Sequence, residues 1–217
     1  MQLFLDGSDV DKIRKYSDFG VIDGVTTNPS IILKSGKNMI EVISELAEIV
    51  SGSVSAEVSA LDSEKMVLEG VKLSEIAKNV TVKLPITWDG LKACNTLSKK
   101  GISVNMTLCF SSSQALLAAK AGAEYVSPFI GRLDDLNLEG IDLISDIKLI
   151  YSNYKFSTKI LAASIRTINH VKQCARFGAD VATIPLDIFE KLVKHPLTES
   201  GLSQFTADWE KTGQSII

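Results

Sequence analysis

One lysine, Lys83, interrupts an apolar run that extends from Val80 to Ile86. Side chains along a strand alternate between its two faces, so Lys83 points away from Val82 and Leu84. If the region that it faces is poorly hydrated, burial lowers the pKa of the amine below its ordinary value of about 10.4. A neutral amine is a nucleophile that attacks carbonyl groups and forms Schiff bases. The same run also fits a lysine at the end of a strand whose ammonium group reaches water.

Polar residues recur on one face of several other expected strands, toward their carboxyl ends. Both faces of a strand are buried in a parallel barrel, so these side chains need a place in its interior. Barrel enzymes keep their active sites at this end of the strands. The polar residues are Asp6, Thr26, Asn28, Ser55, Glu57, Ser59, Lys83, Ser103, Asn105, Thr107, Ser127 and Ser164, with Arg166 two positions further on, and Phe129 shares the face of Ser127.

Most of these residues also have a purely structural explanation. Asp6 could cap a helix, Asn28 could form a turn, Glu57 could pair with Lys83, and Arg132 could form a surface ion pair. Taken together, however, a lysine with nearby carboxylates could exchange protons during a reaction. Two arginines, Arg132 and Arg166, could bind a phosphate through bidentate hydrogen bonds.

Strands and helices alternate along the whole chain. The eight expected strands are 2–6, 24–28, 54–59, 80–86, 102–108, 125–130, 159–164 and 180–186. The helices with a recognisable cap are 9–19 after Ser8, 64–79 after Ser63, 112–121 after Ser111, and 168–177 after Thr167. This order predicts an α/β fold, a single (β/α)8 TIM barrel. A doubly wound open sheet is the alternative, but the glycine-rich phosphate-binding patterns of such folds are absent.

The length of 217 residues suits one barrel domain over 1–217, in which 197–217 form an additional C-terminal helix. Along that segment, Leu202, Phe205 and Trp209 recur roughly at helical spacing. By default we expect this helix to pack on its own barrel. Packing on a neighbouring copy would instead produce an oligomer.

Composition excludes several classes of function. The net charge of -3 gives no indication of nucleic-acid or membrane-surface binding. The three cysteines, Cys94, Cys109 and Cys174, lack metal-like spacing and fit free thiols in a reducing compartment. Two histidines are too few for a metal centre built from several of them. Without a secretory signal or a long apolar run, we expect a soluble cytoplasmic protein.

Six motifs resemble those of the transaldolases, in the short subfamily shared with the fructose-6-phosphate aldolases. They cover almost the whole chain and fall at the ends of the expected strands. In chain order they are Leu5-Asp6, Gly24-Val25-Thr26-Thr27-Asn28-Pro29-Ser30, Val82-Lys83-Leu84-Pro85, Asn105-Met106-Thr107-Leu108, Ser127-Pro128-Phe129-Ile130-Gly131-Arg132 and Ala162-Ala163-Ser164-Ile165-Arg166.

The resemblance implies an enzyme of the pentose phosphate pathway in which Lys83 forms a Schiff base with C2 of a ketose phosphate. Sedoheptulose 7-phosphate and fructose 6-phosphate are such ketoses. The residue that matches Asp6 takes the proton of the C4 hydroxyl, and the C3–C4 bond breaks. A dihydroxyacetone unit stays bound as an enamine and is then transferred to an aldose phosphate. Glu57 matches the carboxylate that relays protons, through a water held with Thr107, and no metal or organic cofactor is required.

The resemblance also implies which residues contact the substrate. Asn28 and Asn105 match the amides that hold the hydroxyls of the dihydroxyacetone unit. The residues that match the phosphate-binding group are Arg132, Ser164 and Arg166. We add Thr26, Ser127 and Phe129 as substrate-binding residues. Members of the short subfamily form homo-oligomers, including decamers in which the final helix reaches across subunits, so a homo-oligomer is expected here.

Three other functions stay open. The sister aldolases release free dihydroxyacetone and tend to have Gln and Tyr where this chain has Glu57 and Phe129. Without a phenol to position water, the enamine should wait for an acceptor, which favours the transaldolase. A pyridoxal-phosphate enzyme would hold its cofactor on Lys83. A sugar-phosphate-binding barrel would bind the same ligands without catalysis.

Overall fold

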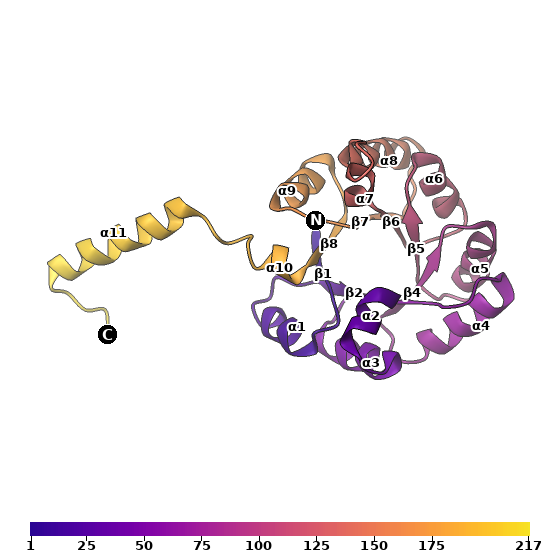
Figure 1. Cartoon of the computed structure of the whole chain (residues 1–217), viewed down its shortest axis with the longest axis horizontal. Coiled ribbons are helices and arrows are strands. Elements are labelled where there is room, and N and C mark those ends of the chain that lie inside the picture. Colours follow the sequence, from indigo (N-terminus) through magenta and orange to yellow (C-terminus); the bar gives the residue numbers. More distant parts are fainter.

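Eight parallel strands close into a barrel in chain order in the computed structural model, which describes residues 1–217. The strands are β1 (Gln2–Asp6), β2 (Gly24–Thr26), β3 (Val54–Glu57), β4 (Val80–Pro85), β5 (Val104–Cys109), β6 (Tyr125–Pro128), β7 (Lys159–Ala162) and β8 (Val181–Pro185). Helices surround this ring of strands (Figure 1). The predicted (β/α)8 barrel is therefore confirmed, and the open sheet is excluded.

Eleven helices accompany the strands, of which the sequence analysis named only those with clear caps. They are α1 (Val10–Ser17), α2 (Pro29–Ser35), α3 (Met39–Ile49), α4 (Ser63–Ser74), α5 (Trp88–Lys99), α6 (Ser112–Lys120), α7 (Ile130–Asp134), α8 (Gly140–Tyr154), α9 (Ile168–Phe177), α10 (Leu186–Phe189) and α11 (Pro196–Thr212). The caps at Ser111 and Thr167 are confirmed. Those at Ser8 and Ser63 are wrong, because the neighbouring carboxylates of Asp9 and Asp62 accept the first-turn N–H groups instead.

Several strands end earlier than predicted, and the residues that follow them belong to loops or to the next helix. β2 ends at Thr26, and Asn28 already caps α2 with its side chain. β6 ends at Pro128, and the segment expected to extend it begins α7. The segment after β7 turns away at Ser164, whose φ of 58° lies in the left-handed region. The alternation of side chains continues past the last strand residue, as from Thr26 to Asn28 and from Ser127 to Phe129, so the sequence pattern overestimated these strands.

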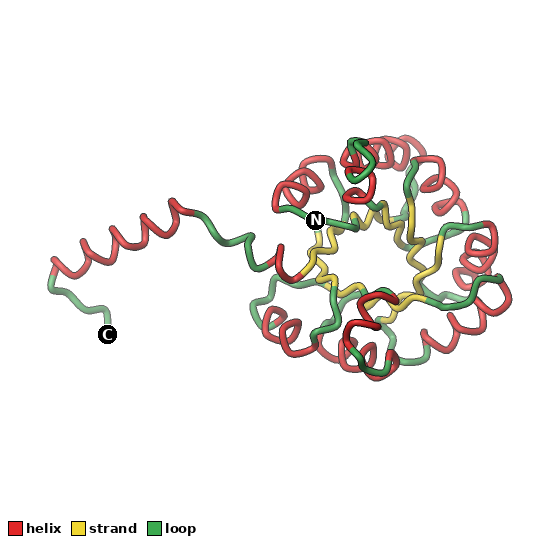
Figure 2. The backbone as a smooth tube through the Cα atoms, viewed as in Figure 1, coloured by secondary structure: helices red, strands yellow, loops and turns green.

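The apolar residues form an outer and an inner cluster. The large outer cluster fills the space between strands and helices and contains Val82 and Leu84 of β4. A small inner cluster, made of Phe4, Tyr125, Leu161 and Val181, fills the barrel itself. Figure 2 shows the two concentric rings of strands and helices that enclose these layers. Because β6 and β8 contribute their first residues to the inner cluster, it blocks the amino-terminal end of the barrel and leaves the carboxyl end for polar side chains.

The last helix, α11, extends away from the barrel and buries none of its residues (Figure 1). Leu202, Phe205 and Trp209 are all exposed. The default expectation that this helix packs on its own barrel is wrong. Pro196 begins the helix, and Gly213, with a φ of 63°, ends it before the predicted limit at residue 217. No helix in the chain has both the length and the apolar composition to cross a bilayer.

Candidate active site

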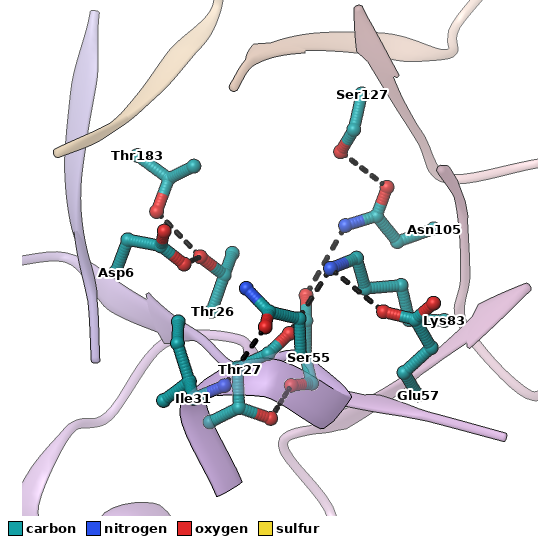
Figure 3. Close-up of polar contacts among 11 residues, drawn as sticks. Asp6, Thr26, Thr27, Ile31, Ser55, Glu57, Lys83, Asn105, Ser127 and Thr183 are labelled. Atoms are coloured by element: carbon teal, nitrogen blue, oxygen red, sulfur yellow. Dashed lines mark hydrogen bonds and ion pairs between the residues drawn. The ribbon is translucent and has the colours of Figure 1, made fainter. Parts of the chain in front are cut away.

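Lys83 lies inside the barrel, with 7% of its side chain exposed. Its Nζ donates a hydrogen bond to the Thr27 carbonyl oxygen at 3.0 Å and lies 3.1 Å from Oε2 of Glu57 (Figure 3). The parallel register places Glu57 directly beside Lys83 on the neighbouring strand. The alternative of an ammonium group that reaches bulk water is therefore wrong. The ion pair with Glu57 is real, and it also places a proton acceptor next to the amine.

Asp6 ends β1 and points into the same space from the opposite side of the barrel (Figure 3). Its Oδ1 accepts a hydrogen bond from the Thr26 hydroxyl at 2.7 Å, and that hydroxyl lies 2.5 Å from the hydroxyl of Thr183. Burial raises the pKa of Asp6 above its ordinary value, while the Thr26 hydrogen bond and the charge of Lys83 oppose this shift. A carboxylate with a raised pKa is suited to take up and return a proton.

Asn105 is fully buried beside Lys83, because the register pairs the two residues across β4 and β5. Its Oδ1 accepts from the Ser127 hydroxyl at 2.8 Å, and its Nδ2 donates to Ser55 Oγ at 3.2 Å. These two bonds determine which way the amide faces. The amide is thus held by two hydroxyls next to the lysine.

Thr107 lies at the end of β5 and is also fully buried. Its hydroxyl has no hydrogen-bond partner among the protein groups. The next residue, Leu108, has a φ of 59°, and the register between β5 and β6 shifts at this point. An unpartnered buried hydroxyl costs about 1–3 kcal/mol, so this group is expected to bond to a water or a bound molecule.

A cavity of about 210 Å³ opens above these residues. It contains most of the predicted site residues, together with Ala163 and Thr183. Its lining consists of Asp6, Thr26, Asn28, Lys83, Ser127, Phe129, Arg132, Ala163, Ser164, Arg166 and Thr183. The remaining predicted residues, Glu57, Asn105 and Thr107, do not line it. The structure therefore brings the predicted residues together, with Glu57 and Asn105 beside Lys83 on the neighbouring strands and Thr107 two residues beyond Asn105 on β5.

The two arginines lie at the same mouth of the barrel but in different surroundings. The guanidinium carbon of Arg132 lies 5.1 Å from the centre of the Phe129 ring. The guanidinium group of Arg166 forms an ion pair with Asp135. The surface ion pair that was the alternative for Arg132 is thus found at Arg166. Both side chains reach the cavity, so two positive charges face one polar space.

Asn28 has two functions that its amide can combine. Its Oδ1 accepts the N–H of Ile31 at 3.0 Å and caps α2, whereas the structural explanation had expected a turn. The residue also lines the cavity. The oxygen already accepts one hydrogen bond from the helix, and both N–H groups of the amide are left for a ligand.

Three contributors to this site were not predicted. Thr183 lies on strand 180–186, for which no inward-facing residues were assigned. A polar threonine within this otherwise apolar strand was the signal that could have identified it. Ser55 was placed on the inward face but not named as a site residue. Thr27 contributes its backbone carbonyl to Lys83, and no side-chain pattern reports such a contact.

The other reactive groups offer no competing centre. Burial raises the pKa of Cys94, Cys109 and Cys174 to about 12, so all three remain thiols. No group of three or more His, Cys, Asp or Glu side chains is arranged to hold a metal ion.

Comparison with known proteins agrees with this geometry. Residues 3–216 match the family model described as Transaldolase/Fructose-6-phosphate aldolase. The chain belongs to this family. A protein of Roseobacter denitrificans named probable transaldolase is 63% identical over 217 residues, which is the full length of both chains. Proteins with the same name from Dinoroseobacter shibae and Cereibacter sphaeroides are each 59% identical over all of this chain and 100% and 99% of their own length. The predicted family and the prediction of a transaldolase-type enzyme are thus confirmed.

Proposed function

We propose that this enzyme transfers a dihydroxyacetone unit between sugar phosphates through a Schiff base on Lys83. In one direction, sedoheptulose 7-phosphate and glyceraldehyde 3-phosphate would give erythrose 4-phosphate and fructose 6-phosphate, a step of the pentose phosphate pathway. The observation that carries the proposal is a buried amine 3.1 Å from one carboxylate, in a cavity that also contains a second carboxylate and two arginines.

The first stage forms the Schiff base. Glu57 accepts a proton from Nζ of Lys83, and the neutral amine attacks C2 of the ketose. The carbinolamine then loses water, with Glu57 returning the proton to the departing oxygen, and an iminium ion remains. The free hydroxyl of Thr107 is available to hold the water in this step.

The second stage breaks the carbon chain. Asp6 takes the proton of the C4 hydroxyl, the C3–C4 bond breaks, and its electrons move into the iminium to give an enamine. The aldose phosphate leaves, and the three-carbon unit stays covalently bound to Lys83. Asn28 and Asn105 would hold its hydroxyl groups. Addition to a second aldose phosphate reverses these steps, and the proposal needs no metal or organic cofactor.

The cavity mouth supports sugar phosphates as substrates. Arg132 and Arg166 supply planar groups with several N–H donors, and Ser164 adds a hydroxyl between them in sequence. In this proposal they bind the phosphate at the far end of both ketose and aldose. Thr26, Ser127 and Phe129 complete the walls around the carbon chain.

The nearest alternative is an aldolase of the same family that releases free dihydroxyacetone. Its enamine must be protonated and then hydrolysed by water. In this chain an aromatic ring without a hydroxyl, Phe129, lines the cavity, and its packing against Phe110 at 5.7 Å between ring centres holds it in place. No hydroxyl at that position can orient a water molecule toward the enamine, which favours transfer over release.

Trapping the intermediate tests the proposal. Incubation with fructose 6-phosphate followed by borohydride should leave a reduced three-carbon adduct on Lys83, located by peptide mass spectrometry, and Lys83→Ala should abolish it. An unmodified Lys83 at saturating substrate would refute the proposal. A coupled assay with and without erythrose 4-phosphate separates transfer from simple cleavage. A yellow purified protein would instead indicate pyridoxal phosphate on the lysine.

We also propose that the enzyme works in the cytoplasm as a homo-oligomer in which α11 packs on a neighbouring copy, and a decamer is one form that the family suggests. The helix projects from the barrel with Leu202, Phe205 and Trp209 exposed. The barrel carries an apolar depression of about 690 Å³ near the base of this helix, lined in part by Phe19, Val21 and Val193. Burial of both apolar surfaces would stabilise the assembly.

A further inference from the structure

A histidine outside the cavity, His170, connects the two segments that carry the arginines of the cavity mouth. It lies in α9, which follows Arg166, while Arg132 lies in α7. His170 Nδ1 accepts a hydrogen bond from the backbone N–H of Arg166 at 3.3 Å. Its Nε2 lies 3.1 Å from Oδ2 of Asp134, the last residue of α7. One imidazole thus joins the backbone of one arginine to the helix of the other.

These contacts determine where the imidazole carries its proton. A backbone N–H can only donate, so Nδ1 of His170 must be unprotonated. The neutral ring then has its proton on Nε2, where it donates to the carboxylate of Asp134. Asp134 is itself held in place, because its Oδ1 accepts the backbone N–H of Gly140 at 2.9 Å. Every donor in this chain of contacts therefore has an acceptor.

The segment that carries Arg166 needs such support. Ser164, two residues earlier, holds a left-handed φ of 58°, which is unfavourable for a residue with a side chain. The Arg166 side chain passes close over Gly131, where a Cβ atom would lie 3.0 Å from the arginine Nε. Nearly half of the Arg166 side chain is exposed, and its guanidinium pairs with a surface carboxylate. The backbone anchor at His170 therefore fixes the point from which this half-exposed side chain starts.

We propose that His170 and Asp134 are positioning residues for the phosphate of the substrate. They hold the backbone of Arg166 against α7 and so keep the guanidinium groups of Arg132 and Arg166 at the spacing that receives one phosphate. The proposal rests on the proposed function, since it takes these arginines to bind that phosphate. Neither His170 nor Asp134 lines the cavity, so the chemistry at Lys83 should not depend on them.

The test compares a phosphorylated with an unphosphorylated ligand. His170→Ala should raise the KM for fructose 6-phosphate and the inhibition constant of inorganic phosphate about tenfold, the effect of losing one well-placed hydrogen bond. Its kcat should stay near that of the parent, because the lost contact is made equally in ground and transition states. Trapping of dihydroxyacetone on Lys83 by borohydride should be unchanged, since this ligand has no phosphate.

Conservative variants separate positioning from simple loss of packing. His170→Asn keeps an acceptor near Nδ1 and should restore much of the phosphate affinity, whereas His170→Gln reaches toward Asp134 but cannot accept from Arg166 and should not. Asp134→Asn can donate an N–H to Nε2 of the imidazole, which would move the ring proton to Nδ1. The Nδ1–H would then face the backbone N–H of Arg166, and that hydrogen bond would be lost. This variant should therefore match His170→Ala.

A second histidine provides the matched control. His195 Nδ1 also accepts a backbone N–H, from Leu197 at 3.1 Å, but it caps α11 far from the cavity. His195→Ala should leave KM and phosphate inhibition unchanged. Parent-like phosphate constants in both His170→Ala and Asp134→Asn would overturn the inference, as would an equal loss of dihydroxyacetone trapping. Failure of the parent enzyme to trap any adduct would refute the proposed function instead, and binding of inorganic phosphate measured by calorimetry would still test the positioning.

Discussion

At the scale of single residues, the site separates its two carboxylates by environment. Glu57 pairs directly with Lys83, while Asp6 is held by a threonine hydroxyl on the other side of the cavity. A carboxylate in an ion pair can accept the proton of its partner at once. A carboxylate that is buried and only partly compensated is suited to the hydroxyl proton of a substrate. This difference explains why the proposed mechanism assigns amine chemistry to Glu57 and carbon–carbon cleavage to Asp6.

Replacing Asp6 by Asn should lower the transfer rate at least about 100-fold, because a general base is lost. The same change should raise the melting temperature at pH 7 by a few degrees. Burial raises the pKa of Asp6 in the folded state, so its contribution to stability is full below the ordinary pKa of 3.8 and is lost as the pH rises through the folded-state pKa. The Asn side chain avoids that loss and still accepts the Thr26 hydrogen bond.

Melting curves of the Asp6→Asn and parent proteins, recorded between pH 3 and 8 in steps of about one pH unit, would check the sign of this difference in stability. The gap in melting temperature should close toward the acidic end, where Asp6 is protonated in the folded and the unfolded states. A variant that is less stable than the parent at pH 7 would contradict the expected effect of burial.

Adding a hydroxyl at Phe129 should change the fate of the enamine. Phe129→Tyr places a phenol in the cavity, where it can orient water, so release of free dihydroxyacetone from fructose 6-phosphate should rise about tenfold or more. Phe110→Tyr is the control, because Phe110 packs against Phe129 without lining the cavity. A coupled assay for dihydroxyacetone without an acceptor measures both. Equal release from the two variants would count against the explanation based on Phe129.

At the scale of elements, the carboxyl ends of the strands are extended by loops that pack on one another. The backbone N–H of Gly131 in α7 donates to the Ser164 carbonyl at 3.1 Å, and a Cβ atom on Gly131 would lie 2.2 Å from that oxygen. The loop after β7 and the start of α7 can approach this closely only because residue 131 has no side chain. This close contact fixes the distance between two cavity residues, Arg132 and Ser164.

Gly131→Ala should therefore separate this helix and this loop. We expect a loss of about 1–3 kcal/mol in the free energy of unfolding from overpacking, together with a higher KM for fructose 6-phosphate. Gly201→Ala in α11 is the matched control, since a Cβ atom there meets no neighbour within 4 Å. Denaturant titration and steady-state kinetics provide the two measurements. A Gly131→Ala protein with parent stability and KM would show that the contact does not set the site.

At the scale of the whole molecule, the barrel and α11 have different sources of stability. The barrel has its own inner and outer apolar clusters, whereas α11 buries nothing within the single chain. A helix without packing is marginally stable in water, so this segment needs a partner surface. The exposed side chains on it, Leu202, Phe205 and Trp209, are the ones that such a surface would cover.

Removal of residues 196–217 should therefore reduce the number of subunits in the particle and leave the barrel folded. Light scattering coupled to gel filtration would measure the mass, and circular dichroism the fold. Phe205→Ala combined with Trp209→Ala should weaken the assembly in the same direction, while Lys211→Ala should not. An unchanged number of subunits after truncation, calculated from the measured mass, would contradict the proposed role of α11 in assembly.

The sequence by itself determined the architecture and most of the candidate site. Alternation within strands predicted that Lys83 points away from Val82 and Leu84, and the order of strands and helices predicted the barrel whose carboxyl ends gather Asp6, Asn105 and Ser127. These features depend on local periodicity and on parallel register, which short stretches of sequence already encode.

Only the tertiary structure decided how these groups are paired. The Lys83–Glu57 contact follows from register between two strands, whereas the contact of His170 with Asp134 and the bond from Lys83 to the Thr27 carbonyl join residues far apart in the sequence. The outward course of α11 likewise could not be predicted, because its apolar residues fit packing on its own barrel or on another copy. Such contacts depend on distances in three dimensions that no periodic pattern along the chain records.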